Sequence, residues 1–143
     1  MKFFMLFCYM LVCSGLMAQN KGDAILGKWI SEKGNLILEV YKINAEFRAR
    51  AVWHNEKIPG NDWKDQNNPD PILKNRKLLG TDMVTQLHYN PNSNQWEDGV
   101  VYDPTSGKSW ESVAWMPSPG LLKVKGYWMM KIFSKTMSFK RLT

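Results

Sequence analysis

Trp96-Glu-Asp-Gly-Val-Val-Tyr-Asp-Pro-Thr-Ser-Gly-Lys-Ser-Trp110 is the stretch that decides the fold, because two apolar arms flank a compact turn signal. In the turn, Pro104 presets one backbone angle and Gly107 supplies a positive φ angle. The alternating apolar and polar residues on either side are typical of half-buried strands. The stretch therefore predicts a β-hairpin with strands over residues 95–103 and 108–116.

The register of this hairpin is open from spacing alone. Pairing of Asp103 with Lys108 places Trp110 on the same face as Val101, whereas a slip of one residue places it beside Tyr102. The register also determines where Asp98 points. An inward carboxylate would strengthen a polar site, and an outward one would leave the hairpin as scaffold.

Short alternating runs with turn signals between them recur along the rest of the chain. The turns include Lys33-Gly34, Asn90 to Asn94 and Pro117 to Gly120. Eight sequential antiparallel strands close most naturally into an all-β up-and-down barrel, which removes exposed edges and can hold one small ligand. A two-sheet sandwich is the alternative. The other strands are expected at residues 25–32, 35–42, 46–54, 80–89, 121–129 and 133–142.

The expected strand 46–54 shows the pattern of a sheet with one dry side. Arg48 and Arg50 share one face of it. The opposite face is apolar and carries Phe47, Ala49, Ala51 and Trp53. The strand pattern therefore predicts an apolar interior and a cationic exterior.

The N-terminus has the features of a secretory signal peptide. Lys2 precedes a short apolar run, and cleavage is expected after Ala18. Residues 1–18 are then the signal peptide and residues 19–143 one domain, exported to the periplasm or the cell exterior. No transmembrane segment is expected in the mature chain, because the apolar run is shorter than the roughly 20 residues that span a bilayer.

Both cysteines, Cys8 and Cys13, fall inside the predicted signal peptide. Acylation of Cys13 is disfavoured because the bulky Val12 precedes it. The mature chain would then carry no thiol, which excludes disulfides, cysteine nucleophiles and thiolate metal sites.

The charge of the mature chain is basic but dispersed. Without Lys2, the 19 basic residues become 18 against 13 acidic ones, a net charge of +5. Such a charge gives weak attraction to anionic surfaces, but a solvated basic exterior is the favoured explanation. A nucleic-acid partner is not expected, because oligonucleotide-binding barrels usually have five strands and work inside cells.

Residues 55–76 interrupt the hairpins with a long polar connection, the best candidate for a lid or a contact surface. It contains a motif of Asp65, Asn68, Pro69 and Asp70, in which the Asp and Asn side chains carry oxygen atoms of the kind that calcium binds. The spacing lacks the glycine and terminal glutamate of an EF-hand, so Asx-turns and an ion pair from Asp65 or Asp70 to Arg76 are favoured over a metal. Asn68 or Asp70 could also cap a short helix that starts at Pro71.

Catalytic patterns are weak in this chain. The sequence contains no Gly-x-Ser-x-Gly elbow, phosphate-binding loop, dinucleotide fingerprint or zinc-type histidine spacing, so neither a cofactor nor a metal is expected. An enzyme would have to use His54, Asp98 or Glu111, and these would have to meet in one cleft.

Gly27-Lys28-Trp29 at the start of the first strand resembles the Gly-x-Trp signature of lipocalins and related calycins. In that superfamily the tryptophan lies across the closed end of the barrel and packs with an arginine of the last strand. The corresponding residue here would be Arg141.

A more extensive resemblance is to DUF2147, an exported bacterial family of unknown function with a lipocalin-like barrel. The chain departs from the family pattern at Lys77, where proline is common, at Asp98, where glycine is usual, and at Trp110, where tyrosine is usual. The resemblance covers nearly the whole mature chain and rests on Gly27-Lys28-Trp29, Val52-Trp53, Asp65 through Pro71, Leu73 through Arg76, Leu79-Gly80, Trp96 through Lys108, and Val124 through Tyr127.

The resemblance implies a carrier or sensor of a small hydrophobic or amphiphilic ligand, held in the barrel. Core packing, or an internal ion pair in the case of Arg76, explains the candidate residues equally well. An interaction module for envelope proteins or polymers, built around residues 55–76, is the alternative function. The candidate ligand-binding residues are Phe47, Trp53, Arg76, Tyr102 and Trp110.

Overall fold

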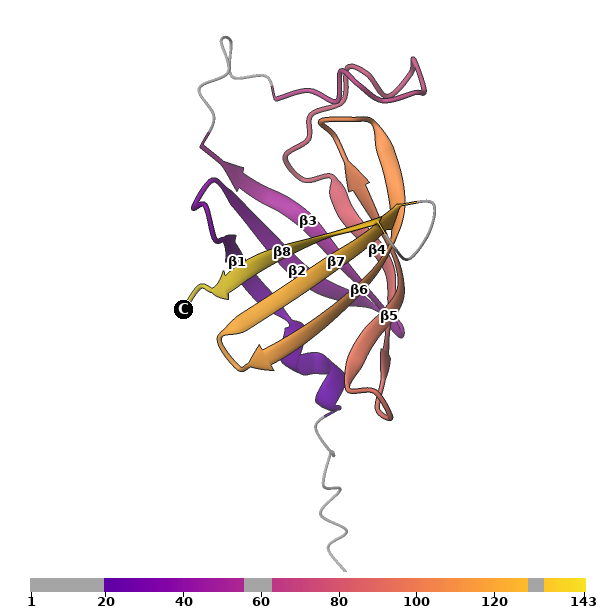
Figure 1. The fold of residues 1–143 in the computed structure, drawn as a ribbon. Helices are drawn as coiled ribbons and strands as arrows, with labels where there is room; N and C mark the ends of the chain where they lie inside the picture. The colour runs from indigo at the N-terminus through magenta and orange to yellow at the C-terminus, as the bar shows by residue number, and fades with distance from the viewer. Residues whose placement is uncertain (1–19, 56–62, 129–132) are drawn as a thin grey trace, which may run out of the picture.

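The computed structural model describes residues 20–55, 63–128 and 133–143, and the predicted signal peptide lies outside them. Within the described residues, eight strands follow one another around a closed barrel, each antiparallel to the next (Figure 1). The predicted up-and-down barrel is confirmed, and the sandwich alternative is wrong. The strands are β1 (Gly27–Ser31), β2 (Leu36–Ile43), β3 (Glu46–His54), β4 (Asp82–Asn90), β5 (Gln95–Asp103), β6 (Lys108–Ser118), β7 (Leu121–Trp128) and β8 (Phe133–Arg141).

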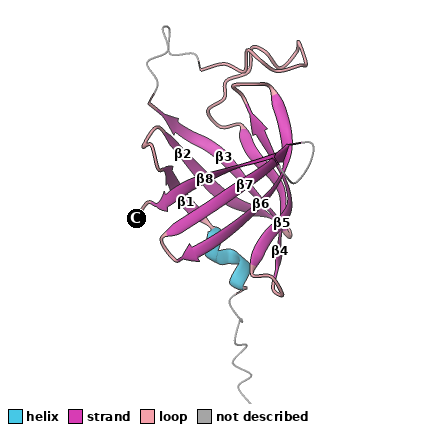
Figure 2. Ribbon diagram, viewed as in Figure 1, coloured by secondary structure: helices cyan, strands magenta, loops and turns pink. Residues whose placement is uncertain are grey.

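A short 3-10 helix, η1 (Lys21–Ile25), precedes β1 at one end of the barrel (Figure 2). Asn20 caps it, since its side-chain oxygen accepts a hydrogen bond from the backbone of Gly22 at 3.0 Å. Sequence periodicity did not predict η1, because one helical turn is too short to show a repeat. No helix in the described part of the chain is long and apolar enough to cross a membrane.

Trp29 and Arg141 close the barrel beside η1. The two residues are paired across β1 and β8, and the Arg141 guanidinium carbon lies 4.2 Å from the centre of the Trp29 ring. Such a cation–π contact contributes on the order of 1 kcal/mol. Trp29 donates to the Ile25 carbonyl at 2.9 Å and Arg141 to the Leu26 carbonyl at 2.9 Å. The predicted packing of Trp29 with Arg141 is confirmed.

Gly27 permits this closure. Its φ angle is +121°, and an added Cβ would lie 3.2 Å from the Arg141 guanidinium. A side chain at this position would therefore be strained and would crowd the arginine.

The core lies inside the barrel, where inward-facing side chains from successive strands pack together. Small residues alternate with large ones, so the layers interdigitate. The buried apolar residues include Trp29, Leu38, Val40, Phe47, Ala49, Ala51, Val84, Leu87, Trp96, Ala114, Leu122 and Phe139.

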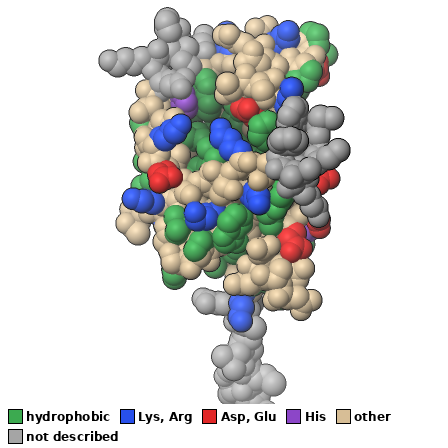
Figure 3. All heavy atoms as spheres, viewed as in Figure 1, with side chains coloured by type: hydrophobic (Ala, Val, Ile, Leu, Met, Phe, Trp, Pro, Cys, Tyr) green, Lys and Arg blue, Asp and Glu red, His purple; other side chains and the backbone are tan. Residues whose placement is uncertain are grey.

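The outer face of β3 carries Arg48 and Arg50, as predicted, but acidic neighbours compensate their charge. Arg48 pairs with Glu46 at 2.9 Å, and Arg50 pairs with Glu39 of β2. On the face shown in Figure 3, basic side chains lie scattered among apolar and uncharged ones. Among the described residues on this face, the basic side chains do not form a continuous cationic track.

The hairpin of β5 and β6 has the register in which Asp103 pairs with Lys108. Val101 and Trp110 are therefore partners on the inner face, while Tyr102 pairs with Ser109 on the outer face. The register places Tyr102 and Trp110 on opposite sides of the barrel wall.

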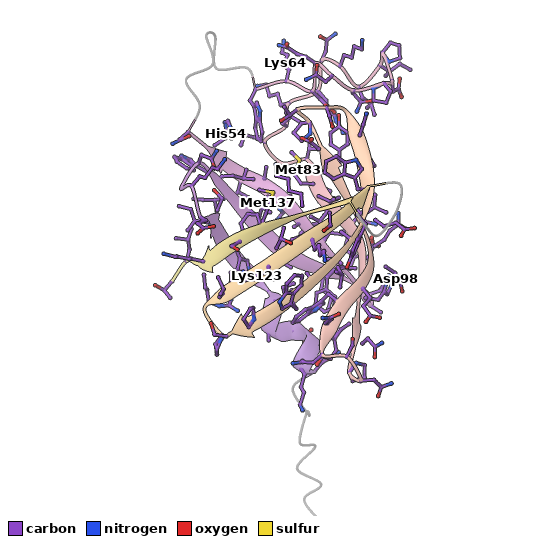
Figure 4. All side chains as sticks on the ribbon, in the orientation of Figure 1. His54, Lys64, Met83, Asp98, Lys123 and Met137 are labelled. Carbon is purple, nitrogen blue, oxygen red and sulfur yellow. The ribbon has the colours of Figure 1, made fainter. Side chains whose placement is uncertain are left out.

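Asp98 lies at an irregularity of β5, between the residue pairs Trp96–Ala114 and Gly99–Ser112. Its side chain is exposed and projects from the outer side of the wall (Figure 4). Its φ angle of 60° is left-handed, a conformation that glycine adopts without strain and that Asp tolerates better than most residues. The structural requirement at this position is therefore a left-handed backbone conformation, and the Asp98 carboxylate does not belong to a site inside the barrel.

Replacing Asp98 by Gly should stabilise the protein by about 0.5 kcal/mol, since relief of the left-handed strain exceeds the added entropy of the unfolded chain. Urea unfolding should show a higher midpoint with an unchanged slope. Asp98→Asn, which keeps the tolerance for positive φ and removes the charge, should match the wild type. A clear loss of stability in Asp98→Gly would mean that the carboxylate makes a stabilising contact.

Candidate functional site

The long connection between β3 and β4 is fastened to the barrel at its base. Lys64 and Lys77 form an antiparallel bridge, and the Leu78 amide donates to the Trp63 carbonyl at 2.9 Å. Leu78 is buried in the core, and the Trp63 ring stacks on His54 at 4.1 Å. The two ends of the connection therefore cover part of the upper barrel.

The far part of the connection is docked on the turn between β5 and β6. The Asn67 side-chain amide donates to the carbonyls of Pro104 and Thr105 at 3.1 and 3.0 Å. A Cβ on Gly107 would lie only 1.9 Å from the Asn67 carbonyl oxygen. The backbone of the connection therefore packs directly against the backbone of the turn, and a side chain at position 107 would not fit between them. Gly107 thus serves two purposes, because its φ angle of +73° also closes the hairpin.

Asp65 joins the connection to the barrel wall and is fully buried, with 0% exposure. It accepts hydrogen bonds from the Tyr102 hydroxyl, from the Asn68 amide at 2.8 Å and from Arg76 Nε at 2.8 Å. The Arg76 guanidinium also lies 5.6 Å from the centre of the Tyr102 ring. We call Asp65, Asn68, Arg76 and Tyr102 the loop lock.

The pKa shifts in the loop lock follow from burial and hydrogen bonding. Burial alone would raise the pKa of Asp65, but donation by Tyr102, Asn68 and Arg76 outweighs it and lowers that pKa. Burial and the bond to Asp65 raise the pKa of Tyr102 to about 12. Asp65 is therefore held as a carboxylate and Tyr102 as a neutral phenol.

Asx-turns shape the segment between Asp65 and Arg76. The Asn68 side-chain oxygen accepts from the Asp70 amide at 2.8 Å, and Asp70 Oδ1 accepts from the Ile72 amide at 2.9 Å. The predicted Asx-turns and the ion pair from Asp65 to Arg76 are confirmed. From Pro71 the chain forms turns and no regular helix, and Asp70 caps the first of them through the Ile72 amide.

A pocket of about 260 Å³ lies between the docked connection and the outer face of β4, β5 and β6. We call it the loop pocket. Arg76 and Asp82 supply its charges, and Met83 and Val100 supply apolar surface. The lining residues are Asn68, Pro69, Arg76, Asp82, Met83, Thr85, Val100, Tyr102, Gly107 and Ser109.

The Arg76 guanidinium is positioned for a ligand in the loop pocket. Its bond to Asp65 uses Nε, so the two terminal nitrogens, which could bind a carboxylate or phosphate in a bidentate way, take no part in it. Thr85 and Ser109 add neutral hydroxyl groups. The arrangement suits a small molecule with an anionic end and a short apolar body.

The other predicted binding residues lie elsewhere. Phe47 is buried in the core. Trp53 pairs with Ile37 while Ala51 pairs with Leu38, so an extra residue in β3 turns Trp53 to the outer side, where it is 41% exposed. The expectation that Trp53 shares a face with Phe47 is therefore wrong, because a β-bulge interrupts the alternation.

Trp110 faces the barrel interior beside Val101 and Gly126. Among the described residues, its Nε1 and the hydroxyl of the inward-facing Ser112 are buried without a hydrogen-bond partner. The structure brings Arg76 and Tyr102 together, with Asn68 and Pro69 from the loop motif. It does not bring Phe47, Trp53 or Trp110 to them.

The candidate catalytic residues do not meet in one cleft. His54 stacks on Trp63 at the end of β3, Asp98 is exposed on β5, and Glu111 is exposed on β6, where it pairs with Val100 on the outer face. Within the described ranges, no group of three His, Cys, Asp or Glu side chains is placed to hold a metal ion.

Comparison with known proteins identifies a family that matches the sequence and a solved structure with a similar fold. The family described as an uncharacterized protein conserved in bacteria (DUF2147) matches residues 27–141. The solved structure of protein HP1028 from Helicobacter pylori, described as belonging to the lipocalin family, is similar with a TM-score of 0.70 and 23% identity over 82% of each chain. No curated protein matches the chain significantly.

Proposed function

We propose that this chain, which belongs to the DUF2147 family, is an exported protein that binds a small amphiphilic molecule in the loop pocket. Export to the periplasm or cell exterior is supported by the N-terminal sequence, with Lys2, a short apolar run and the small residue Ala18, after which cleavage is expected. The lipocalin-like barrel acts as a rigid scaffold for the site.

The observation that carries the proposal is the placement of Arg76 in the loop pocket. Its Nε is fixed by the buried carboxylate of Asp65, and its ring contact with Tyr102 limits the remaining freedom of the guanidinium. A cation that is already positioned loses little entropy when a ligand binds. Apolar wall residues beside it, Met83 and Val100, fit a ligand with one charged end.

The geometry favours the outer wall of the barrel over its interior as the location of the ligand-binding site. The inner faces of the strands carry large buried side chains such as Trp29, Phe47 and Trp96. Where an inner position is glycine, neighbouring side chains fill the space, since a Cβ on Gly99 would lie 2.4 Å from Leu87. The loop pocket, in contrast, is open space bordered by charged and apolar groups.

Arg76→Gln should lower the affinity for the co-purifying ligand at least tenfold, because it removes the anion-binding group. Native mass spectrometry of protein purified from its host should show a small amphiphilic anion in the wild type and its loss in this variant. Lys74→Gln, which removes an exposed cation from the same connection, is the matched control and should retain the ligand.

Val100→Phe tests the pocket without touching the loop lock, since the larger ring would occupy ligand space. It should also lose the ligand while the melting temperature stays near that of the wild type. Absence of any bound molecule in the wild type would contradict the function. A ligand retained by both Arg76→Gln and Val100→Phe would place binding elsewhere, such as inside the barrel.

A second candidate function is contact with an envelope protein or polymer through the connection. Ile72 favours it, because this apolar side chain is 86% exposed at the far part of the connection. Crosslinking in envelope extracts with wild type and Ile72→Ser would test it. Equal recovery of partners from the two proteins would count against this function.

A further inference from the structure

A second pocket, of about 400 Å³, lies at the closed end of the barrel. We call it the closed-end pocket. It is separated from the loop pocket by the length of the barrel, because η1 and the turns after β2 and β4 lie at the opposite end from the long connection (Figure 1). Its lining residues are Asn20, Lys21, Lys42, Ala45, Phe47, His88, Tyr89 and Pro91.

The walls of the closed-end pocket are held in place by neighbouring contacts. Trp96 Nε1 donates to the Gly22 carbonyl at 3.0 Å and joins η1 to β5. A Cβ on Gly22 would lie 2.8 Å from the Cβ of Tyr89, so η1 rests directly on this wall residue. The Tyr89 hydroxyl donates to Asn94 at 2.7 Å, which fixes the ring. The pocket is therefore formed before any ligand enters.

The chemistry of the lining is cationic around an apolar floor. Lys21 and Lys42 contribute positive charge, the described lining includes no carboxylate, and Phe47 and Tyr89 contribute aromatic surface. Lys42 lies 5.2 Å from the centre of the Phe47 ring and donates to Asp23 at 2.9 Å. This ion pair is partly exposed and therefore weak, and it uses one of three donors of the ammonium group.

We propose that the closed-end pocket is a second, separate binding site for an amphiphilic anion in which one carboxylate or phosphate is joined to an apolar body. The anionic group is held by Lys21 and Lys42, and the apolar body packs on Phe47, Tyr89 and Pro91. The volume lies within the range usual for small-molecule sites. This binding does not depend on the function proposed for the loop pocket.

Titration calorimetry of the purified protein at low ionic strength tests this site, with sodium octanoate, 1-octanol and inorganic phosphate as probes. Octanoate should bind more tightly than either of the others, because only octanoate uses both the lysines and the apolar floor. The double variant Lys21→Gln/Lys42→Gln should weaken octanoate binding at least tenfold and leave octanol binding unchanged. Lys33→Gln/Lys123→Gln, an equal loss of charge outside the pocket, should bind octanoate like the wild type.

Backbone amide NMR shifts locate the bound octanoate, and they should concentrate at Ala45 and Tyr89. Shifts at Asn68 and Gly107 instead would assign octanoate to the loop pocket and overturn the proposal. The proposal would also be overturned if the wild-type protein did not bind octanoate. It would be overturned as well if the octanoate affinity were unchanged in both the double variant and the single variant Lys21→Gln. If inorganic phosphate bound as tightly as octanoate, the site would recognise only the anionic group and not the apolar body. This result would also contradict the proposal.

Discussion

Gly107→Ala is expected to destabilise the protein by roughly 2–4 kcal/mol, because one methyl group disturbs both the hairpin and the docked connection. The φ angle of +73° is left-handed, which costs an alanine about 1–2 kcal/mol. The new Cβ would lie 1.9 Å from the Asn67 carbonyl oxygen, a backbone atom that cannot rotate away. The connection must shift, and the bonds from Asn67 to Pro104 and Thr105 would be lost.

Gly34→Ala is the matched control for this variant. Gly34 has a nearly identical φ angle of +70°, but an added Cβ there has no neighbour within 4 Å. The control should therefore show only the left-handed cost, and the difference in unfolding free energy between the two variants measures the docking of the connection. Equal losses in the two variants would mean that the connection is not held against Gly107.

Hydrogen exchange separates global from local effects of Gly107→Ala. Amides in the turns of the connection, such as those of Asn68 and Arg76, should show a larger increase in exchange rate than amides in the buried part of β1. Because the loop pocket includes Gly107, Asn68 and Pro69, the variant should also bind the ligand less tightly. Uniform acceleration of all amides would show that the hairpin, and not the docking contact, carries the cost.

Much of the barrel could be predicted from sequence because its signals are local. The turn from Asp103 to Gly107 encodes its own geometry, and each strand carries its alternation within a few residues. The pairing of Trp29 with Arg141 joins distant parts of the chain, and it was predictable only through the resemblance to lipocalins. The eight strands therefore appear where the sequence predicts them, within a few residues.

The side chains that face a site could not be predicted as well, because β-bulges reverse the alternation. The extra residue in β3 turns Trp53 outward, and the pairing of β4 shows a similar shift beside Met83. A bulge depends on the neighbouring strand, so a single strand's sequence does not reveal it. The left-handed φ angle of 60° at Asp98 was not predicted either, because the sequence places this residue in an ordinary strand and indicates only a question of which way its carboxylate points.

The candidate site was predicted in its residues but not in its location. Arg76, Tyr102, Asn68 and Pro69 were expected to serve a barrel interior or a loop, and they meet on the outer wall instead. The contact that brings them together links residues about forty positions apart, as in the bond from Tyr102 to Asp65. Met83, Val100 and Ser109 were missed, because nothing in a strand's own sequence shows that a distant connection will cover it.

Asp65→Asn should lower the unfolding free energy by about 3 kcal/mol at neutral pH, since it removes a buried carboxylate that satisfies three donors. An asparagine of the same size can accept fewer hydrogen bonds, and its own amide group would face the donors of Asn68 or Arg76. Urea unfolding measures the loss. Asp70→Asn is the matched control, because Asp70 is exposed and its carboxylate caps only a local turn.

The cost of Asp65→Asn should depend on pH in a direction set by the lowered pKa of Asp65. A carboxyl group whose folded pKa is depressed contributes its full stability above its unfolded value, near 3.8, and loses that contribution as pH falls through the folded value. The difference between wild type and variant should therefore be constant from pH 7 to about 5 and shrink below pH 4. A difference that stays constant into strong acid would contradict a charged Asp65.

Tyr102→Phe tests the loop lock at alkaline pH, where the Tyr102 hydroxyl ionises. The pKa of Tyr102 is raised to about 12 from an ordinary value of 10.0, so its bond to Asp65 stabilises the fold fully below pH 10.0 and progressively less as pH rises toward 12. The stability difference between wild type and Tyr102→Phe should shrink over that range. In the double variant with Asp65→Asn the two losses should sum to more than the measured total, because both variants break one bond. Strict additivity would contradict a direct hydrogen bond between Tyr102 and Asp65.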